Sequence, residues 1–245
     1  MIVRTVDRAL MMLEAFAERG APMTLSELSR LLRMPTSTCF GVMRTLQARG
    51  YLYEVGGRKT FYPTSRWLAM GRKIEKNDPV QEHLQAFLEK LRDATGESVI
   101  LSKRLGDAIV YLNVLESTQT VRYSAAAGDL KPMHSTSSGK ALISTLAEPD
   151  RTQLIARLRG AGAAGARLPA AQRAQLIDEI KLGARRGWYV GRGENVMDVM
   201  GVAAPVYVSD EVFAIAVAGP MVRVEPKLHA HAKQLVWICR ALLRK

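Results

Sequence analysis

The first fifty residues carry apolar side chains at helical spacing in three successive segments. Residues 5–17 predict one helix with a buried face, and the segment TLSELSRLL predicts a second, because Thr24 stands three residues before Glu27 in a capping-box pattern. The segment PTSTCFGVMRTLQARG predicts a third helix that begins near Pro35 and ends at Gly50. The expected inward residues are Val6, Ala9, Leu10, Leu13 and Phe16 in the first helix, Leu25, Leu28, Leu31 and Leu32 in the second, and Cys39, Val42, Met43 and Leu46 in the third.

A hairpin and a basic helix are expected next. YLYEVGGRKTFYPT contains two strand-like runs around Gly56 and Gly57, with Arg58 and Lys59 at the tip. Two helices joined by a short turn and followed by such a hairpin predict a winged helix-turn-helix. The segment SRWLAMGRKIEKND predicts a helix that links two domains.

Beyond Gly96 the apolar period changes from helical spacing to two. SVILSKRL, AIVYLNVL and TVRYSAA predict strands, and helices are expected near Leu146, over 150–158 and over 170–186, with a flexible run at 160–167. Three strand-like pieces and a last amphipathic helix close the chain. The order predicts an antiparallel sheet flanked by helices, an α+β domain. The expected divisions are 1–64, a linker helix at 65–77, and 78–245.

The net charge of +12 indicates a polyanionic partner or simply a well-solvated surface. Residues 1–76 hold 13 Lys+Arg against 6 Asp+Glu, or +7, which is more than half of the excess. We therefore expect the winged helix to contact double-stranded DNA. The hydroxyls of residues 36–38 could reach phosphates or base edges, or could merely cap the helix. The candidate DNA-binding residues are Thr24, Ser26, Thr36, Ser37, Thr38, Phe40, Arg44, Arg58 and Lys59.

The stretch PMHSTSSGKALIST has the texture of a phosphate-binding loop. A Walker motif needs glycine where this chain has His134, and a hydroxyl residue where it has Ala141. A nucleotide is therefore not expected there. The free N–H groups at a helix N-terminus could still hold another anion without a metal.

Taken together, the segments RALMMLEAF, TLSELSRLL, STCFGVMRTLQARGYL, PMHSTSSGKALIS and GENVMDVMGVAAPV resemble the IclR family of bacterial transcription regulators over nearly the whole chain. The resemblance implies a winged helix-turn-helix, a linker helix and a GAF-like effector-binding domain, in proteins that bind operators as dimers or dimers of dimers. One position departs from the family, which usually has arginine where this chain has Gly41. The operator sequence therefore cannot be taken from relatives.

The resemblance also implies an effector pocket beside the hydroxyl run, for a small organic acid with an aromatic or other apolar body. The expected anion ligands are the amides of Ser137, Ser138 and Gly139, and the alternative is a serine-capped helix without a ligand. The remaining candidates are Val121, Tyr123, Gly191, Glu194, Gly201, Ala216 and Ala218, which could equally be ordinary core. Glu194 would repel a carboxylate placed close to it.

Other kinds of protein are less well supported. No catalytic constellation is readable, although His134 and its neighbouring serines could be imagined as a hydrolytic pair in the C-terminal cleft. Cys39 and Cys239 lie in apolar helical patterns, so neither a disulfide nor a metal site is expected, and no cofactor is. No apolar run is long enough to span a membrane, and a cytoplasmic protein is expected. A DNA-binding module whose second domain only oligomerises stays open.

Overall fold

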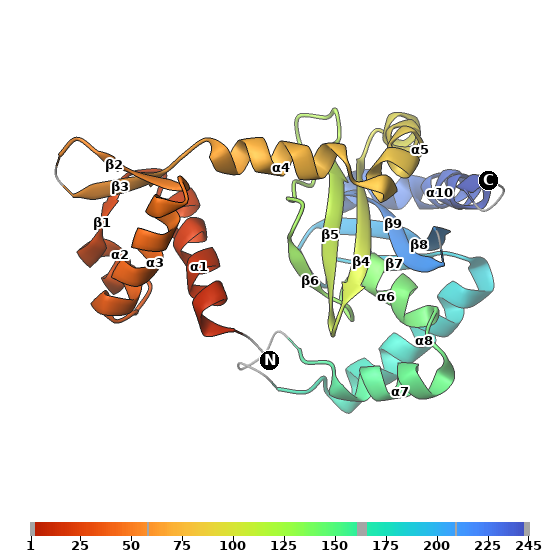
Figure 1. Ribbon diagram of the computed structural model, residues 1–245. Coiled ribbons are helices and arrows are strands. Elements are labelled where there is room, and N and C mark those ends of the chain that lie inside the picture. The colour runs from red at the N-terminus through yellow and green to blue at the C-terminus, as the bar shows by residue number, and fades with distance from the viewer. Residues whose placement is uncertain (1–2, 58, 161–165, 209, 243–245) are drawn as a thin grey trace. The chain divides into compact units, whose positions relative to one another are not determined.

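The chain divides into two compact units, Met1–Asp78 and Pro79–Lys245. The computed structural model describes residues 3–57, 59–160, 166–208 and 210–242 (Figure 1).

The first unit is a winged helix-turn-helix followed by a long helix. Its elements are α1 (Arg4–Arg19), β1 (Met23–Thr24), α2 (Leu25–Leu31), α3 (Thr36–Ala48), β2 (Leu52–Val55), β3 (Thr60–Pro63) and α4 (Arg66–Lys76). The strands form a small antiparallel sheet in the order β1-β3-β2. The strand β1 was not expected, because two residues are too few to show a period of two. The first turn of α4 packs on the base of this wing, where the Trp67 indole donates to the Tyr51 carbonyl at 3.1 Å.

Local chemistry explains the helix-turn-helix. The expected capping box is present, since the Thr24 hydroxyl accepts from the Glu27 amide and the Glu27 carboxylate accepts from the Thr24 amide. The inward stripe of α3 contains the four residues that the spacing predicts. In the turn between α2 and α3, the Ser29 hydroxyl donates to the Met34 carbonyl at 2.7 Å, and Arg33 adopts a left-handed conformation.

The predicted inward faces of α1 and α2 are only partly correct. Phe16 and Leu28 are buried, but Val6, Leu10 and Leu31 are each more than half exposed, and Met12 is fully buried in their place. Helical spacing indicates a face of the right width. Which residues of that face are covered depends on the neighbouring elements.

The second unit is an antiparallel sheet between two layers of helices, which confirms the α+β class (Figure 1). The six strands are β4 (Ser98–Leu105), β5 (Ala108–Leu115), β6 (Leu130–Pro132), β7 (Tyr189–Arg192), β8 (Val199–Val208) and β9 (Glu211–Pro220), in the order β6-β5-β4-β9-β8-β7. The helices are α5 (Pro79–Thr95), α6 (Ser137–Ser144), α7 (Glu148–Arg157), α8 (Ala170–Arg186), the short α9 (Met221–Val224) with a 3-10 turn (Glu225–Lys227), and α10 (Leu228–Leu242).

The two faces of the sheet have separate cores. Residues of α5 and α10 pack on one face against Val99, Leu101 and Val217, while those of α6, α7 and α8 pack on the other against Ile100, Ala203 and Ala216. The second face is lined by small residues on β8 and β9. Because these take little space, α6 lies close to the sheet.

The strand predicted for TVRYSAA, residues 120–126, is not formed. This described segment has no regular secondary structure. Its backbone is held by a side chain instead, since the Ser98 hydroxyl donates to the Tyr123 carbonyl at 2.6 Å. The short strand β6 takes the sheet edge next to β5. Part of the run predicted as flexible, 161–165, and Ser209 of the predicted Ser-Asp turn lie outside the described residues.

Candidate functional site

The outer face of α3 presents the side chains expected to meet DNA. Phe40, Gly41 and Arg44 are exposed on the side opposite the buried stripe, and Ser37 is exposed one turn earlier. Phe40 is 52% exposed, which is unusual for an aromatic residue beside a well-packed core. An exposed aromatic ring next to an arginine gives this face both apolar and cationic contacts for a base edge.

The hydroxyls at the start of α3 do not cap it. Pro35 occupies the N-cap position, and no side chain accepts a hydrogen bond there. The hydroxyl oxygens of Thr36 and Ser29 lie 3.2 Å apart, and this hydrogen bond joins α3 to α2. Thr38 is half-buried. The capping alternative is therefore wrong for this helix. Ser37, at the positive end of the helix dipole, is left as the hydroxyl best placed to meet a phosphate.

Two further candidates come from the start of α2. The Thr24 hydroxyl donates to the Glu27 carboxylate at 2.9 Å, so its proton is committed to the capping box. Ser26 is exposed. Thr24 therefore holds the helix, and Ser26 is the better placed of the two to reach a partner.

At the tip of the wing, Gly56 and Gly57 both have positive φ angles, as does Lys59 with a φ of 52°. The Lys59 amide donates to the Glu54 carboxylate at 3.2 Å, which holds the turn. Its side chain is exposed, and Arg58 lies outside the described residues.

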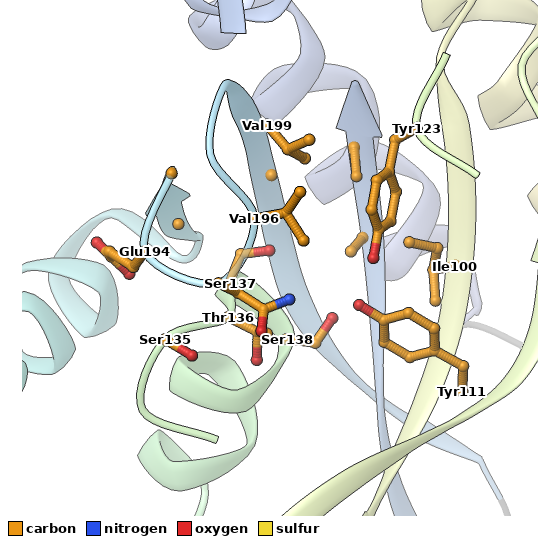
Figure 2. Close-up of a pocket in the computed structure, with 16 residues that line it drawn as sticks. Ile100, Tyr111, Tyr123, Ser135, Thr136, Ser137, Ser138, Glu194, Val196 and Val199 are labelled. Atoms are coloured by element: carbon orange, nitrogen blue, oxygen red, sulfur yellow. The ribbon is translucent and has the colours of Figure 1, made fainter. Parts of the chain in front are cut away.

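A small pocket in the second unit lies between the N-terminus of α6 and the sheet (Figure 2). Its walls come from β4, β5, the 117–128 segment, the loop after β7, and β8 and β9. Eight of the ten predicted effector residues line it: Tyr123, Ser137, Ser138, Gly191, Glu194, Gly201, Ala216 and Ala218.

Glu194 is among these residues, but its carboxylate turns away from the pocket. It lies 2.6 Å from the Lys140 ammonium, and Figure 2 shows it pointing away from the tyrosines. The expected repulsion of a bound carboxylate is thereby reduced, because the negative charge of Glu194 is paired with a cation.

Two predicted residues do not take part as expected. Val121 is 69% exposed and does not line the pocket, because its segment is irregular rather than a strand. The amide of Gly139 donates to the Thr136 hydroxyl at 3.1 Å, so it is used by the helix cap. A Cβ at Gly139 would overlap the Met133 backbone, so glycine is needed there for close packing. Thr136, rather than a serine, caps this helix, and within the described chain the amides of Ser137 and Ser138 donate to no acceptor.

Glycines on the sheet let the serine turn approach. A Cβ at Gly201 would stand 2.8 Å from the Ser137 hydroxyl oxygen, and one at Gly191 would stand 3.1 Å from the Ser137 amide nitrogen. Larger residues at either position would push this turn away from the sheet. These two glycines therefore set the floor of the pocket rather than merely lining it.

Sequence reasoning missed the polar group that faces the serines. Tyr111 on β5 is buried, and Figure 2 shows its hydroxyl directed toward Ser138, with the hydroxyl of Tyr123 pointing to that of Tyr111. Burial and a hydrogen bond with Tyr123 raise the pKa of Tyr111, so this hydroxyl stays protonated. The sequence did contain one indication that Tyr111 is buried, because Tyr111 lies two residues after Ile109 and so on the same face of β5. The pocket thus offers neutral donors from two sides.

Lys140 is a second residue whose role the sequence did not reveal. Its side chain is buried, and its ammonium donates to the Val190 carbonyl at 3.0 Å and lies 2.6 Å from both Glu179 and Glu194. The lysine that resembled a phosphate ligand is thus occupied by two carboxylates. It joins α6, α8 and the loop after β7.

The pocket is small, with a volume of about 40 Å³. Sites for drug-sized ligands usually measure roughly 300–1,000 Å³. The remaining walls are apolar, formed by Ile100, Val196 and Val199 with the two alanines of β9. In this state the pocket has room for a few water molecules or a very short acid.

The pocket contains no arrangement typical of a catalytic centre. His134 lies in a neighbouring cavity rather than in this pocket, and in the described part of the chain no hydrogen bond joins it to a serine hydroxyl. Burial, together with the positive charge of Lys140, lowers the pKa of His134.

Across the described ranges, no group of three or more His, Cys, Asp or Glu residues could hold a metal ion. No helix in those ranges has both the length and the apolar character to cross a membrane.

Comparison with known proteins places both units. Residues 5–56 match the IclR helix-turn-helix domain, and residues 73–241 match the C-terminal domain of bacterial IclR transcriptional regulators. The acetate operon repressor of Salmonella typhimurium is 27% identical over 233 residues, which cover 91% of this chain and 82% of that protein.

Two solved structures share the fold. The IclR protein of Thermotoga maritima has a TM-score of 0.77 at 20% identity, with 98% of each chain covered. An IclR homologue from Microbacterium hydrocarbonoxydans, solved with 4-hydroxybenzoate, has a TM-score of 0.73 at 20% identity and covers 98% of this chain and 100% of its own. The capped α2, the exposed face of α3 and the domain matches agree, and the chain belongs to the IclR family of bacterial transcriptional regulators.

Proposed function

We propose that this regulator binds operator DNA through α3 and the wing, and that a small organic acid in the α6 pocket controls the binding. The division of labour follows 1–64 for DNA, 65–77 as the linker and 78–245 for the effector. The observation that carries the DNA proposal is the exposed set of Ser37, Phe40 and Arg44 on α3. The basic excess of residues 1–76 adds a sequence-independent attraction to phosphates.

Gel shifts with DNA from upstream of neighbouring genes test this part. Arg44→Ala should weaken specific binding by about 1–3 kcal/mol if Arg44 reads a base, whereas Lys59→Ala should mainly reduce the salt dependence. The half-sites should lie roughly 34–36 Å apart, or a multiple of this distance. Equal affinity for the operator and for random duplex at physiological salt would refute operator recognition.

A homodimer, or a dimer of dimers, fits the exposed apolar residues of the first unit. Val6 and Leu10 on α1 and Leu68 and Ile74 on α4 are each more than half exposed, which is costly for a monomer. Two copies that bury these residues would present two α3 helices to a pseudo-twofold operator. Ile74→Asp should shift the protein toward monomer in sedimentation experiments, and an unchanged mass would count against this surface.

The effector proposal rests on the convergence of neutral donors at one point. The Ser137 and Ser138 amides at the N-terminus of α6 and the hydroxyls of Ser138, Tyr111 and Tyr123 surround a space with apolar walls. A carboxylate is the anion that suits such donors without a metal. The 4-hydroxybenzoate bound by one homologue supports the acid class. The small volume favours short acids here, because an aromatic ring needs Val196 or Tyr123 to move.

Calorimetry with a graded panel of acids, from two carbons to a benzoate, tests the class and the size. Ser138→Leu should abolish binding and leave operator affinity without effector nearly unchanged. Tyr123→Phe removes one hydroxyl while keeping the ring, and should weaken binding about tenfold, as the loss of one hydrogen bond to a charged group predicts. If no acid binds, or if Ser138→Leu binds equally well, the hydroxyl run serves only as a helix cap.

Control of DNA binding requires that the acid favours one arrangement of the protein over another. Coupling of about 1–3 kcal/mol, or roughly 5- to 150-fold in operator affinity, is typical. We place this coupling in the linker helix α4. Unchanged operator affinity at saturating acid would favour a second unit that only oligomerises, and turnover of the acid would favour an enzyme.

A further inference from the structure

A separate groove lies between α7 and α8. Its volume is about 680 Å³, and it shares no lining residue with that pocket. Both helices lie at one edge of the second unit (Figure 1). Neither the operator nor the acid proposed above uses this groove.

The groove has a strongly cationic rim. Arg151, Arg167, Arg173, Lys181 and Arg185 line it, against a single carboxylate, Glu148. Glu148 is already paired with Arg151. Within the described residues, no carboxylate forms an ion pair with the other four cations, and residues 161–165 contain no charged side chain. These four positive charges therefore lack a counter-charge within the groove.

The floor of the groove is apolar. Ile155 and Ile180 are buried at its base, and Ile177 is 38% exposed above them. Ala156 and Ala184 are exposed and small, so a partner's backbone can come close to both helices. An apolar strip bordered by cations is complementary to a surface on which a strip of hydrophobic residues is bordered by acids.

The length of the groove decides the kind of partner. From Arg173 to Arg185 the helix advances about 18 Å, at 1.5 Å per residue. A small acid carries its charge at one end and cannot meet cations spread over this distance. Duplex DNA has enough charge but presents no apolar strip to Ile177. A second copy that met this groove through its own α7–α8 face would bring the same unpaired cations and would be repelled there.

The geometry points to an acidic amphipathic helix of another protein as the occupant of the α7–α8 groove. A helix of about three turns spans the distance, and its apolar residues at spacings of three and four would rest on Ile177 and the alanines. Its carboxylates would face Arg173, Lys181 and Arg185. The regulator would then have a protein-docking surface in addition to its DNA and effector sites.

A fluorescein-labelled peptide of about fifteen residues, with leucines on one helical face and glutamates elsewhere, is a suitable probe for the full-length protein. A scrambled peptide of equal composition controls for charge alone. Fluorescence anisotropy should show at least tenfold tighter binding of the amphipathic peptide. The double variant Lys181→Glu, Arg185→Glu should weaken that binding at least tenfold. Ile177→Asp should do the same without removing a cation.

Lys233→Glu combined with Arg240→Glu, at two exposed positions of α10, is the matched charge control and should bind the peptide as the wild type does. The proposal is overturned if both peptides bind equally, if the control variant loses as much affinity as the groove variant, or if the groove variant loses affinity for duplex DNA and not for the peptide. Circular dichroism of each variant checks that the fold is kept.

Discussion

Replacing Gly41 by alanine separates the stability of α3 from its contact with DNA. Gly41 lies in the interior of α3, is exposed and has no positive φ angle. A Cβ built there meets no heavy atom within 4 Å. Alanine can therefore replace it without strain in the free protein. The free energy of unfolding of the first unit should rise by about 1 kcal/mol, the difference between glycine and alanine in a helix interior.

The same methyl group should harm DNA binding. It would project from the face that also carries Phe40 and Arg44, and we propose that the absence of a side chain at Gly41 lets the helix backbone come close to DNA. We expect operator affinity to fall at least tenfold, or by about 1.4 kcal/mol. Stability and binding would then change in opposite directions, which a simple loss of fold cannot produce.

Stability is measured by denaturation with Trp67 as the reporter, in a background of Trp188→Phe and Trp237→Phe. Trp67 packs on Tyr51 within the first unit, so its fluorescence follows that unit. Gly71→Ala in α4 is the control for helix propensity, since a Cβ there also meets open space. If Gly41→Ala gains stability and keeps its full operator affinity, Gly41 makes no close approach to DNA. If it loses stability, the helix-propensity reasoning is wrong.

Three further outcomes are expected. Lys140→Met should lower the free energy of unfolding by about 3 kcal/mol, because Glu179 and Glu194 lose their shared cation. Urea titrations measure this change, and a loss below about 1 kcal/mol would contradict the prediction. Gly201→Ala should lower the free energy of unfolding by about 1–3 kcal/mol and abolish acid binding, since the new methyl group displaces Ser137. Acid binding of unchanged affinity in calorimetry would argue against a fixed serine turn. The pKa of His134 is lowered in the folded protein, so below about pH 6.5 the unfolded chain binds more protons at this residue than the folded chain does. The contribution of His134 to the free energy of unfolding therefore declines as the pH falls, by up to about 1.4 kcal/mol per pH unit. His134→Gln should therefore lose less stability than the wild type between pH 7.5 and 5.5 in the same titrations, and equal losses would assign the effect elsewhere.

The parts of the fold that were predicted correctly have a local cause. The stripe of α3 and the capping box of α2 depend on residues three and four positions apart, so the sequence contains all the information. The predicted buried face of α1 was correct for Phe16 but wrong for Val6 and Leu10, because the exposure of these two residues depends on what surrounds the helix. The false strand over 120–126 has the right period but finds no partner strand, since β6 takes the sheet edge.

The pocket was harder to predict, because its residues converge from distant segments. The serines were found from their position at a helix start. Tyr111, Lys140 and Glu179 were missed, because their roles arise only when β5, α6 and α8 are packed together. Lys140 directly precedes the apolar run Ala141–Ile143 of α6. This position was a usable signal, since a buried lysine requires carboxylate partners.

The two sides of the α6 pocket differ in how firmly they are held. The serine turn is packed against Met133, Gly191 and Gly201 and tied below by Lys140, so it cannot shift without overlap or loss of an ion pair. Another wall is the loop from Gly193 to Asp198, where both end residues have positive φ angles and Met197 is 82% exposed. Enlargement of the pocket is therefore expected from this loop or from Tyr123, and not from the serine turn. Substitutions in the loop can change which acid body is accepted while the grip on the carboxylate stays the same.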